Sequence, residues 1–168
     1  KQAHKMIIAY IIGKFEEESS PFDWIKLIEG GIYEFLHRIV FTDIKPPIFH
    51  RLLKENGEKL NKWAYEQILF RLNNKQYRFL DNYQNYFFDE SYAVKEKMIL
   101  RAAHYLATNW EFKHIYELNR NFYGIEDTKK EIEGEIENYY SLDAIKEMLS
   151  IKRIQHFIDL AGQLRFQK

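Results

Sequence analysis

Apolar residues recur at helical spacing along almost the whole chain, and few residues interrupt the pattern. Only three prolines and seven glycines occur among the 168 residues, so the periodic segments are long. A repeat of three to four residues places apolar side chains on one face of an α-helix. No pair of segments shows the alternation typical of β-strands. The sequence therefore predicts an all-α fold, a compact bundle of about six helices.

Breaks in the first third of the pattern predict where three helices begin and end. The first helix is expected over residues 2–18. Asp23 is a suitable N-cap, because its carboxylate can accept hydrogen bonds from the first backbone N–H groups of a helix over residues 24–40. Pro46 and Pro47 are expected to open a third helix.

The remainder of the chain is less evenly divided. Residues 73–89 are rich in aromatic side chains and predict a loop or a short helix. A long helix is expected over residues 91–121, and Asp127 or Thr128 should cap the next one. A last helix is expected to begin near Ser150.

Composition limits the class of protein. The length suits one domain over residues 1–168, with 46% hydrophobic residues to form a core. Twenty-five basic and 25 acidic residues cancel, which argues against nucleic acid or a membrane surface as a partner. The absence of cysteine excludes disulfides and thiolate chemistry. The longest apolar run, residues 6–12, is too short to span a bilayer, and a cytoplasmic location is expected.

Histidine and carboxylate side chains are the remaining candidates for chemistry. His4 precedes an apolar run on the first helix. His104 stands among alanines on a strongly apolar helix, where it is either a hydrogen-bonded core residue or a metal ligand. Glu34 is flanked by apolar residues, and its simplest role is an ion pair with Arg38 one helical turn later.

Two Glu-x-x-His steps, Glu34–His37 and Glu111–His114, raise a different possibility. At this spacing both side chains share one helix face, and two such pairs can hold two iron ions in a four-helix bundle. That site also needs a glutamate from each of two further helices, and no isolated core glutamate stands upstream of either pair. A ferritin-like di-iron bundle is therefore an alternative hypothesis.

The order of several segments resembles the HD-domain metal-dependent phosphohydrolase superfamily, especially its small 5'-deoxynucleotidase-like group. The family shows an early "EHS", then "HDxxE", a "GDxxxPxK"-like turn and a later "KxADxL". In this chain "KQAHKMIIAYII" is similar to the first element, with His4 at the histidine position. "YEFLHRIVFTDIKPPIF" is similar to the second and third, with Asp43 and Pro47 in the turn. "ILRAAHYLATNWEF" is similar to the fourth.

The resemblance implies an HD-like helical fold in which the metal site has changed. Family members bind a divalent cation through two His and two Asp residues, and a Glu assists the metal-bound water. At the His-Asp pair this chain has Glu34 and Phe35. Arg38 takes the position of the family's assisting Glu, and His104 takes the position of the family's Asp in the later helix. Only at His4 and at the turn residue Asp43 does this chain have the same residue type as the family.

Two hypotheses follow from these replacements. In the first, which we favour, the domain keeps the fold with a degenerate site, a vestigial Asp43 and weak or no catalysis, and acts as a structural or ligand-sensing partner. In the second, His4, Glu34 and His104 form a reassigned metal site in an active phosphohydrolase. Two histidines and one carboxylate suit Mn, Co, Zn or Fe. The first hypothesis needs no metal.

The partners expected from the resemblance are a nucleotide or phosphate ligand and either a second HD domain or another copy of the chain. Lys45 and Arg38 are weak candidates for contact with phosphate, because basic residues at this density usually form a solvated face. The terminal "FIDLAGQLRFQK" resembles the stretch that leads into an HD domain. We therefore expect the chain to be a piece of a longer, tandem HD polypeptide.

Overall fold

The computed structural model of the chain describes residues 2–41, 44, 46–72, 77–118, 125–139 and 142. Within these ranges it contains six α-helices and no strand, which confirms the all-α prediction. The chain divides into two compact units. Unit 1 comprises residues 1–22 and 98–168, and unit 2 comprises residues 23–97. The prediction of one domain over residues 1–168 stays a prediction.

Unit 2 begins with helix α2 (Trp24–Val40), whose start is fixed by its N-cap. Oδ1 of Asp23 accepts hydrogen bonds from the backbone N–H groups of Ile25 at 2.9 Å and Lys26 at 3.3 Å. These bonds satisfy N–H groups that have no partner inside the helix. The backbone N–H of Asp23 itself donates to the Glu96 carboxylate at 2.6 Å. The predicted N-cap is therefore confirmed.

Helix α3 (Pro46–Arg71) opens at the proline pair, as predicted. Proline suits the first turn of a helix, because its missing N–H has no helical partner there. Asn56 has non-helical backbone angles (φ −139°, ψ 27°), so α3 consists of two helical segments joined at a kink. The sequence places Gly57 directly after this residue.

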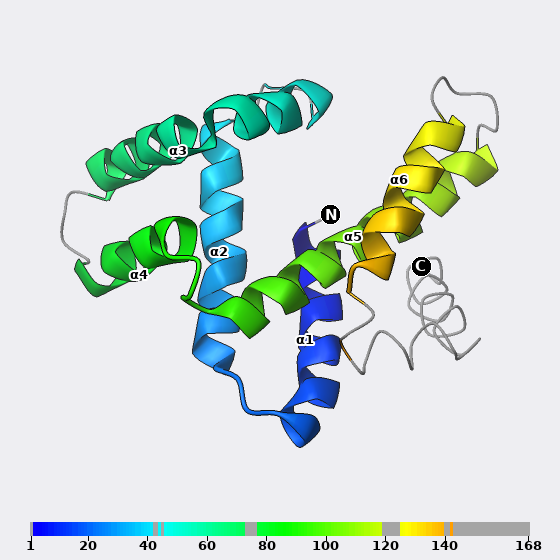
Figure 1. The fold of residues 1–168 in the computed structure, drawn as a ribbon, viewed down its shortest axis with the longest axis horizontal. Coiled ribbons are helices and arrows are strands. Elements are labelled where there is room, and N and C mark those ends of the chain that lie inside the picture. The colour runs from blue at the N-terminus through cyan, green and yellow to red at the C-terminus, as the bar shows by residue number, and fades with distance from the viewer. Residues whose placement is uncertain are drawn as a thin grey trace, which may run out of the picture. The chain divides into compact units, whose positions relative to one another are not determined.

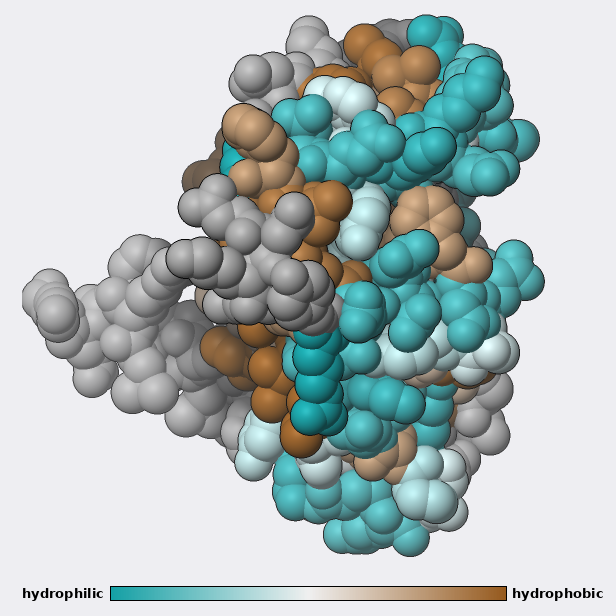
Figure 2. Space-filling view, turned by 90° about the vertical axis from the view of Figure 1, so that its left-hand side faces the viewer, coloured by the Kyte–Doolittle hydropathy of each residue, from teal (hydrophilic) through white to brown (hydrophobic). Residues whose placement is uncertain are grey.

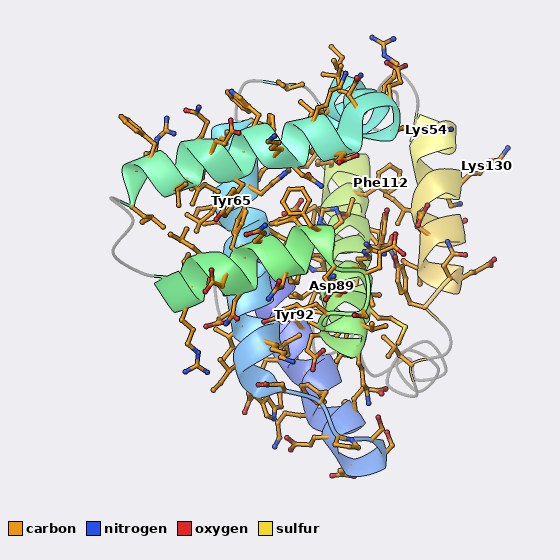
Figure 3. The ribbon with its side chains drawn as sticks, turned by 60° about the vertical axis from the view of Figure 1, so that its left-hand side comes forward. Lys54, Tyr65, Asp89, Tyr92, Phe112 and Lys130 are labelled. Carbon is orange, nitrogen blue, oxygen red and sulfur yellow. The ribbon has the colours of Figure 1, made fainter. Side chains whose placement is uncertain are left out.

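Helix α4 (Tyr77–Phe88) lies within residues 73–89, where the sequence predicts a loop or a short helix. Figure 1 shows α3 and α4 side by side, both crossing α2. In Figure 3 the Tyr65 side chain of α3 lies toward α4, where its ring stacks on Tyr83 with the centroids 6.0 Å apart. Aromatic packing among these three helices forms the core of unit 2.

Unit 1 contains helix α1 (Gln2–Ser19), helix α6 (Ile125–Glu137) and all but the first turn of helix α5 (Val94–Leu118). Helices α1 and α5 meet at His4 and Trp110. Tyr139, just beyond α6, stacks on Tyr105 of α5 with the ring centroids 6.0 Å apart, and Figure 1 shows α6 running beside α5. The bounds of α1 agree closely with the predicted first helix.

The beginning of α6 differs from the prediction. The helix begins at Ile125, so Asp127 and Thr128 lie inside its first turn and neither is the N-cap. The sequence offers several polar residues near this point, and the spacing of apolar residues does not choose between them. The last predicted helix, near Ser150, lies outside the described residues.

Hydrophobic and hydrophilic side chains are mixed on the surface. The face in Figure 2 is largely hydrophilic, with hydrophobic patches between the polar side chains. In the part of the chain that the structure describes, no helix combines the length and apolar content needed to cross a membrane.

Candidate functional site

Helix α2 carries four of the residues singled out from the sequence, and Glu34 is the first of them. Its Oε1 atom accepts a hydrogen bond of 2.7 Å from the hydroxyl of Tyr86 on α4. Tyr86 is buried, and a buried hydroxyl without a partner would carry a desolvation cost of about 1–3 kcal/mol. Glu34 therefore satisfies a core tyrosine and joins α2 to α4.

Arg38 is held by the turn that follows α2. Its Nη2 atom donates to the backbone carbonyl of Ile44 at 3.1 Å, and its guanidinium carbon lies 4.7 Å from the centre of the Phe49 ring. A guanidinium over an aromatic face gains electrostatic attraction in addition to packing. The Arg38 side chain thus fastens the connection between α2 and α3.

Phe35, the next residue of α2 singled out from the sequence, does not belong to the core. The side chain is 47% exposed, and a phenyl ring cannot coordinate a cation. Asp43 and Lys45, the two candidates in the following turn, lie outside the described residues.

His37 is enclosed by aromatic rings and one polar partner. Its ring stacks on Phe87 with the centroids 4.6 Å apart and contacts Phe41 at 5.0 Å. Nε2 lies 3.0 Å from Oδ1 of Asn61 on α3; with that oxygen as acceptor, Nε2 carries the hydrogen. Burial lowers the pKa of the His37 imidazole from its ordinary value of 6.5. The arrangement favours a neutral, structural histidine.

A hydrogen-bond network beside Glu34 holds Tyr33, the buried tyrosine of α2. The Tyr33 hydroxyl donates to Oε2 of Glu29 at 2.9 Å, and the Asn82 amide donates to the same oxygen at 3.1 Å. Burial, followed by the hydrogen bond to the Glu29 carboxylate, raises the pKa of Tyr33 well above its usual range. Tyr33 therefore stays protonated as a hydrogen-bond donor.

In unit 1 His4 packs against the indole of Trp110. The two ring centroids are 4.5 Å apart in an edge-to-face arrangement, and the ring of His114 lies at the same distance from Trp110. Nδ1 of His4 and Nε1 of Trp110 are buried and have no hydrogen-bond partner among the described residues.

His104 is half-buried on α5. Its ring meets Tyr105 edge-to-face at 5.4 Å, and its backbone carbonyl accepts a hydrogen bond from the Thr108 hydroxyl at 2.8 Å. The neighbouring alanines, Ala103 and Ala107, are fully buried, so their small side chains allow close packing of α5. These contacts of His104 are with residues of its own helix, α5.

Neither predicted metal site is assembled by the described residues. Among them, no three His, Asp or Glu side chains form a group that could hold a metal ion. The reassigned site divides between the units, with Glu34 in unit 2 and the two histidines, His4 and His104, in unit 1. That three-residue site stays a prediction.

The four ligands of the di-iron hypothesis are also divided between the two units. Glu34 and His37 belong to unit 2, and Glu111 and His114 belong to unit 1. Within unit 2, the Nε2 atom of His37 is already bonded to Asn61. Within unit 1, His114 is exposed. This hypothesis also stays a prediction.

The sequence pattern does not indicate the partners that give these residues their roles. Tyr86 is 52 residues from Glu34, and Asn61 is 24 residues from His37. One signal was available for the first pair: Tyr83, Tyr86 and Phe87 share a helix face at a spacing of three and four residues. No comparable pattern distinguishes Asn61 from the other polar residues of α3.

Comparison with known proteins assigns no family to this chain. Comparisons of the chain with protein-family models, with curated proteins and with solved structures find no significant match.

Proposed function

We propose that this chain is a divergent HD-like domain in which helix α2 serves packing in place of metal-dependent phosphate hydrolysis. One observation carries the proposal: Arg38, at the position of the assisting glutamate, bonds the Ile44 carbonyl and covers the Phe49 ring. A residue held in this way fixes a turn. It also brings positive charge where the family places a base.

The neighbouring positions support the same conclusion. Glu34 is bonded to the Tyr86 hydroxyl, and Phe35 offers no ligand atom. Activation of a water molecule by a divalent cation needs several donor atoms, together with a carboxylate that accepts a proton. In this proposal the chain acts as a structural or ligand-sensing companion to a catalytic domain.

We expect the domain to release no phosphate from nucleoside 5'-monophosphates above the rate of a blank, even with added Mn or Co. The physical reason is the loss of a ligand at Phe35 and of the base at Arg38. The measurement is phosphate release over hours at neutral pH, with an active HD-domain nucleotidase in parallel as a control. Metal content of the purified protein is measured on the same samples.

Robust metal-dependent hydrolysis that is abolished by His4→Ala would contradict the proposal and establish the reassigned site instead. The double variant Phe35→Asp, His104→Asp restores two carboxylates at the family positions. It should raise metal affinity above that of the unmodified chain, because carboxylates neutralise the charge of the cation. Equal metal binding by both proteins would argue against the alignment with the HD pattern.

A second prediction tests the packing role of Glu34 directly. Glu34→Ala and Tyr86→Phe should each destabilise unit 2, and their effects should be coupled by about 1 kcal/mol, because they remove the acceptor and the donor of one hydrogen bond. Chemical denaturation of the two single variants and the double variant measures the coupling. Glu34→Ala combined with Tyr92→Phe is the control, with additive effects expected. A coupling of zero for Glu34 and Tyr86 would remove the structural role.

A further inference from the structure

Helix α2 is apolar on two opposite sides, and only one of them is buried in unit 2. The buried side includes Leu27, Gly30, Tyr33 and His37. Five large apolar side chains on the opposite side are between 43% and 64% exposed, and we call them the outer stripe: Ile25, Ile28, Ile32, Phe35 and Ile39. An apolar side of a helix is normally covered by a partner, so a helix with two such sides is expected to have partners on both.

The outer stripe has the geometry of a helix-pairing seam. Its members are spaced three, four, three and four residues apart, the spacing of the a and d positions of a heptad repeat. At 100° per residue they occupy a band about 80° wide that runs for about 21 Å along the helix. Scattered exposed apolar residues do not line up in this way.

No charged side chain lies within the outer stripe. The residues that border it, Trp24 and Leu36, are also apolar. Glu29 directly follows Ile28 in the sequence, and its carboxylate is bonded to Tyr33 and Asn82 of unit 2. A partner with charged groups at this surface would leave them desolvated and unpaired. The matching surface is therefore an uncharged, aliphatic helix face with the same spacing.

We propose that the outer stripe is the interface with a second copy of this chain, formed by two α2 helices packed side by side. The five side chains expose about 100 Å² each, so a symmetric pair would bury about 1,000 Å² in total, the lower bound for a specific interface. A two-fold axis lets one uncharged stripe supply its own complement. The proposal does not depend on the function proposed above.

The helix ends favour an antiparallel pair. Each helix has partial positive charge at its N-terminus and partial negative charge at its C-terminus. Antiparallel packing places opposite ends beside each other, whereas parallel packing places like ends together. Ile32 lies midway along the stripe, so the two-fold axis passes close to it, and Ile25 of one copy faces Ile39 of the other.

Sedimentation equilibrium tests the interface. The unmodified protein should be a dimer, and Ile32→Glu should weaken association at least about 100-fold, because two carboxylates would be buried together at the axis. Phe70→Glu on α3 is the matched control: Phe70 is 82% exposed and lies outside the stripe, so association should not change. Far-ultraviolet circular dichroism should show equal helix content in all three proteins.

Disulfide crosslinking tests the direction, and the chain has no cysteine to interfere. Under mild oxidation Ile32→Cys should form a covalent dimer. Ile25→Cys and Ile39→Cys should crosslink when mixed, and Ile25→Cys alone should not. In an antiparallel pair two copies of residue 25 are about 21 Å apart, whereas a disulfide needs Cα atoms within about 7 Å.

Three results would overturn the proposal. A monomer at every concentration up to the solubility limit would show that no second copy binds. A dimer that survives Ile32→Glu would place the interface elsewhere. If the protein is a monomer and the Ile32→Glu substitution unfolds it, another part of the same chain covers the outer stripe. Crosslinking of Ile25→Cys with itself would overturn the antiparallel arrangement.

Discussion

Replacing Tyr33 by alanine should lower the free energy of unfolding of unit 2 by about 3–5 kcal/mol, the range for a large aromatic side chain in a core. Tyr33 is only 1% exposed. Its ring meets Phe79 edge-to-face at 5.0 Å and Tyr83 at 5.5 Å. Alanine would leave a cavity between α2 and α4, and would leave Glu29 with Asn82 as its remaining partner in this network.

Chemical denaturation followed by circular dichroism measures this effect, and two variants serve as controls. Tyr33→Phe removes only the hydroxyl, so its cost should be about 1 kcal/mol. Tyr10→Ala removes a tyrosine that is 58% exposed on α1, and should change stability by no more than about 0.5 kcal/mol. Equal costs for Tyr33→Ala and Tyr33→Phe would show that the ring contributes nothing to the core.

His37 should make unit 2 less stable as the pH falls below the ordinary imidazole pKa of 6.5. Burial lowers its folded pKa, so below pH 6.5 the unfolded chain binds a proton that the folded chain resists. Stability is therefore full above this value and declines as the pH falls toward the folded pKa. Two charged neighbours act in opposite directions: Glu34 raises the pKa and Arg38 lowers it.

Substitution of His37 by phenylalanine isolates this contribution. The variant keeps an aromatic ring against Phe87 and Phe41 but cannot bind a proton, so the loss of stability between pH 7 and pH 5 should be smaller. Trp63→Phe is the control, because it changes an aromatic ring that packs on Phe41 but has no titrating group, so the pH profile should stay unchanged. The measurement is the free energy of unfolding at each pH. An identical profile for His37→Phe would exclude His37 as the titrating group.

The sequence predicted the helices well where local chemistry decides their ends. Asp23 caps α2 with its own side chain, and the proline pair opens α3 because it cannot continue a preceding helix. These effects act within one turn of the chain, so neighbouring residues are enough to recognise them. Where local signals compete, as at Asp127 and Thr128, the predicted cap of α6 was wrong.

The roles of the candidate site residues could not be predicted in the same way. Glu34 was expected to pair with Arg38 one turn away, but it is bonded to Tyr86 on another helix. Arg38 reaches the Ile44 carbonyl and Phe49 beyond the end of α2. A side chain chooses among partners that only packing brings within hydrogen-bond distance, so spacing along one helix does not identify them.

The amino-acid sequence by itself determined that this chain is helical and where most of its described helices begin, since apolar period, capping and proline placement are properties of short segments. It did not determine which side of α2 is buried, because α2 has large apolar residues on two opposite sides. Tertiary structure decided this: Tyr33 and His37 pack with α3 and α4, and Ile25, Ile32 and Ile39 stay exposed. The physical reason is that hydrophobic burial has no direction of its own, so the choice of face depends on the aromatic and hydrogen-bond partners that distant segments supply.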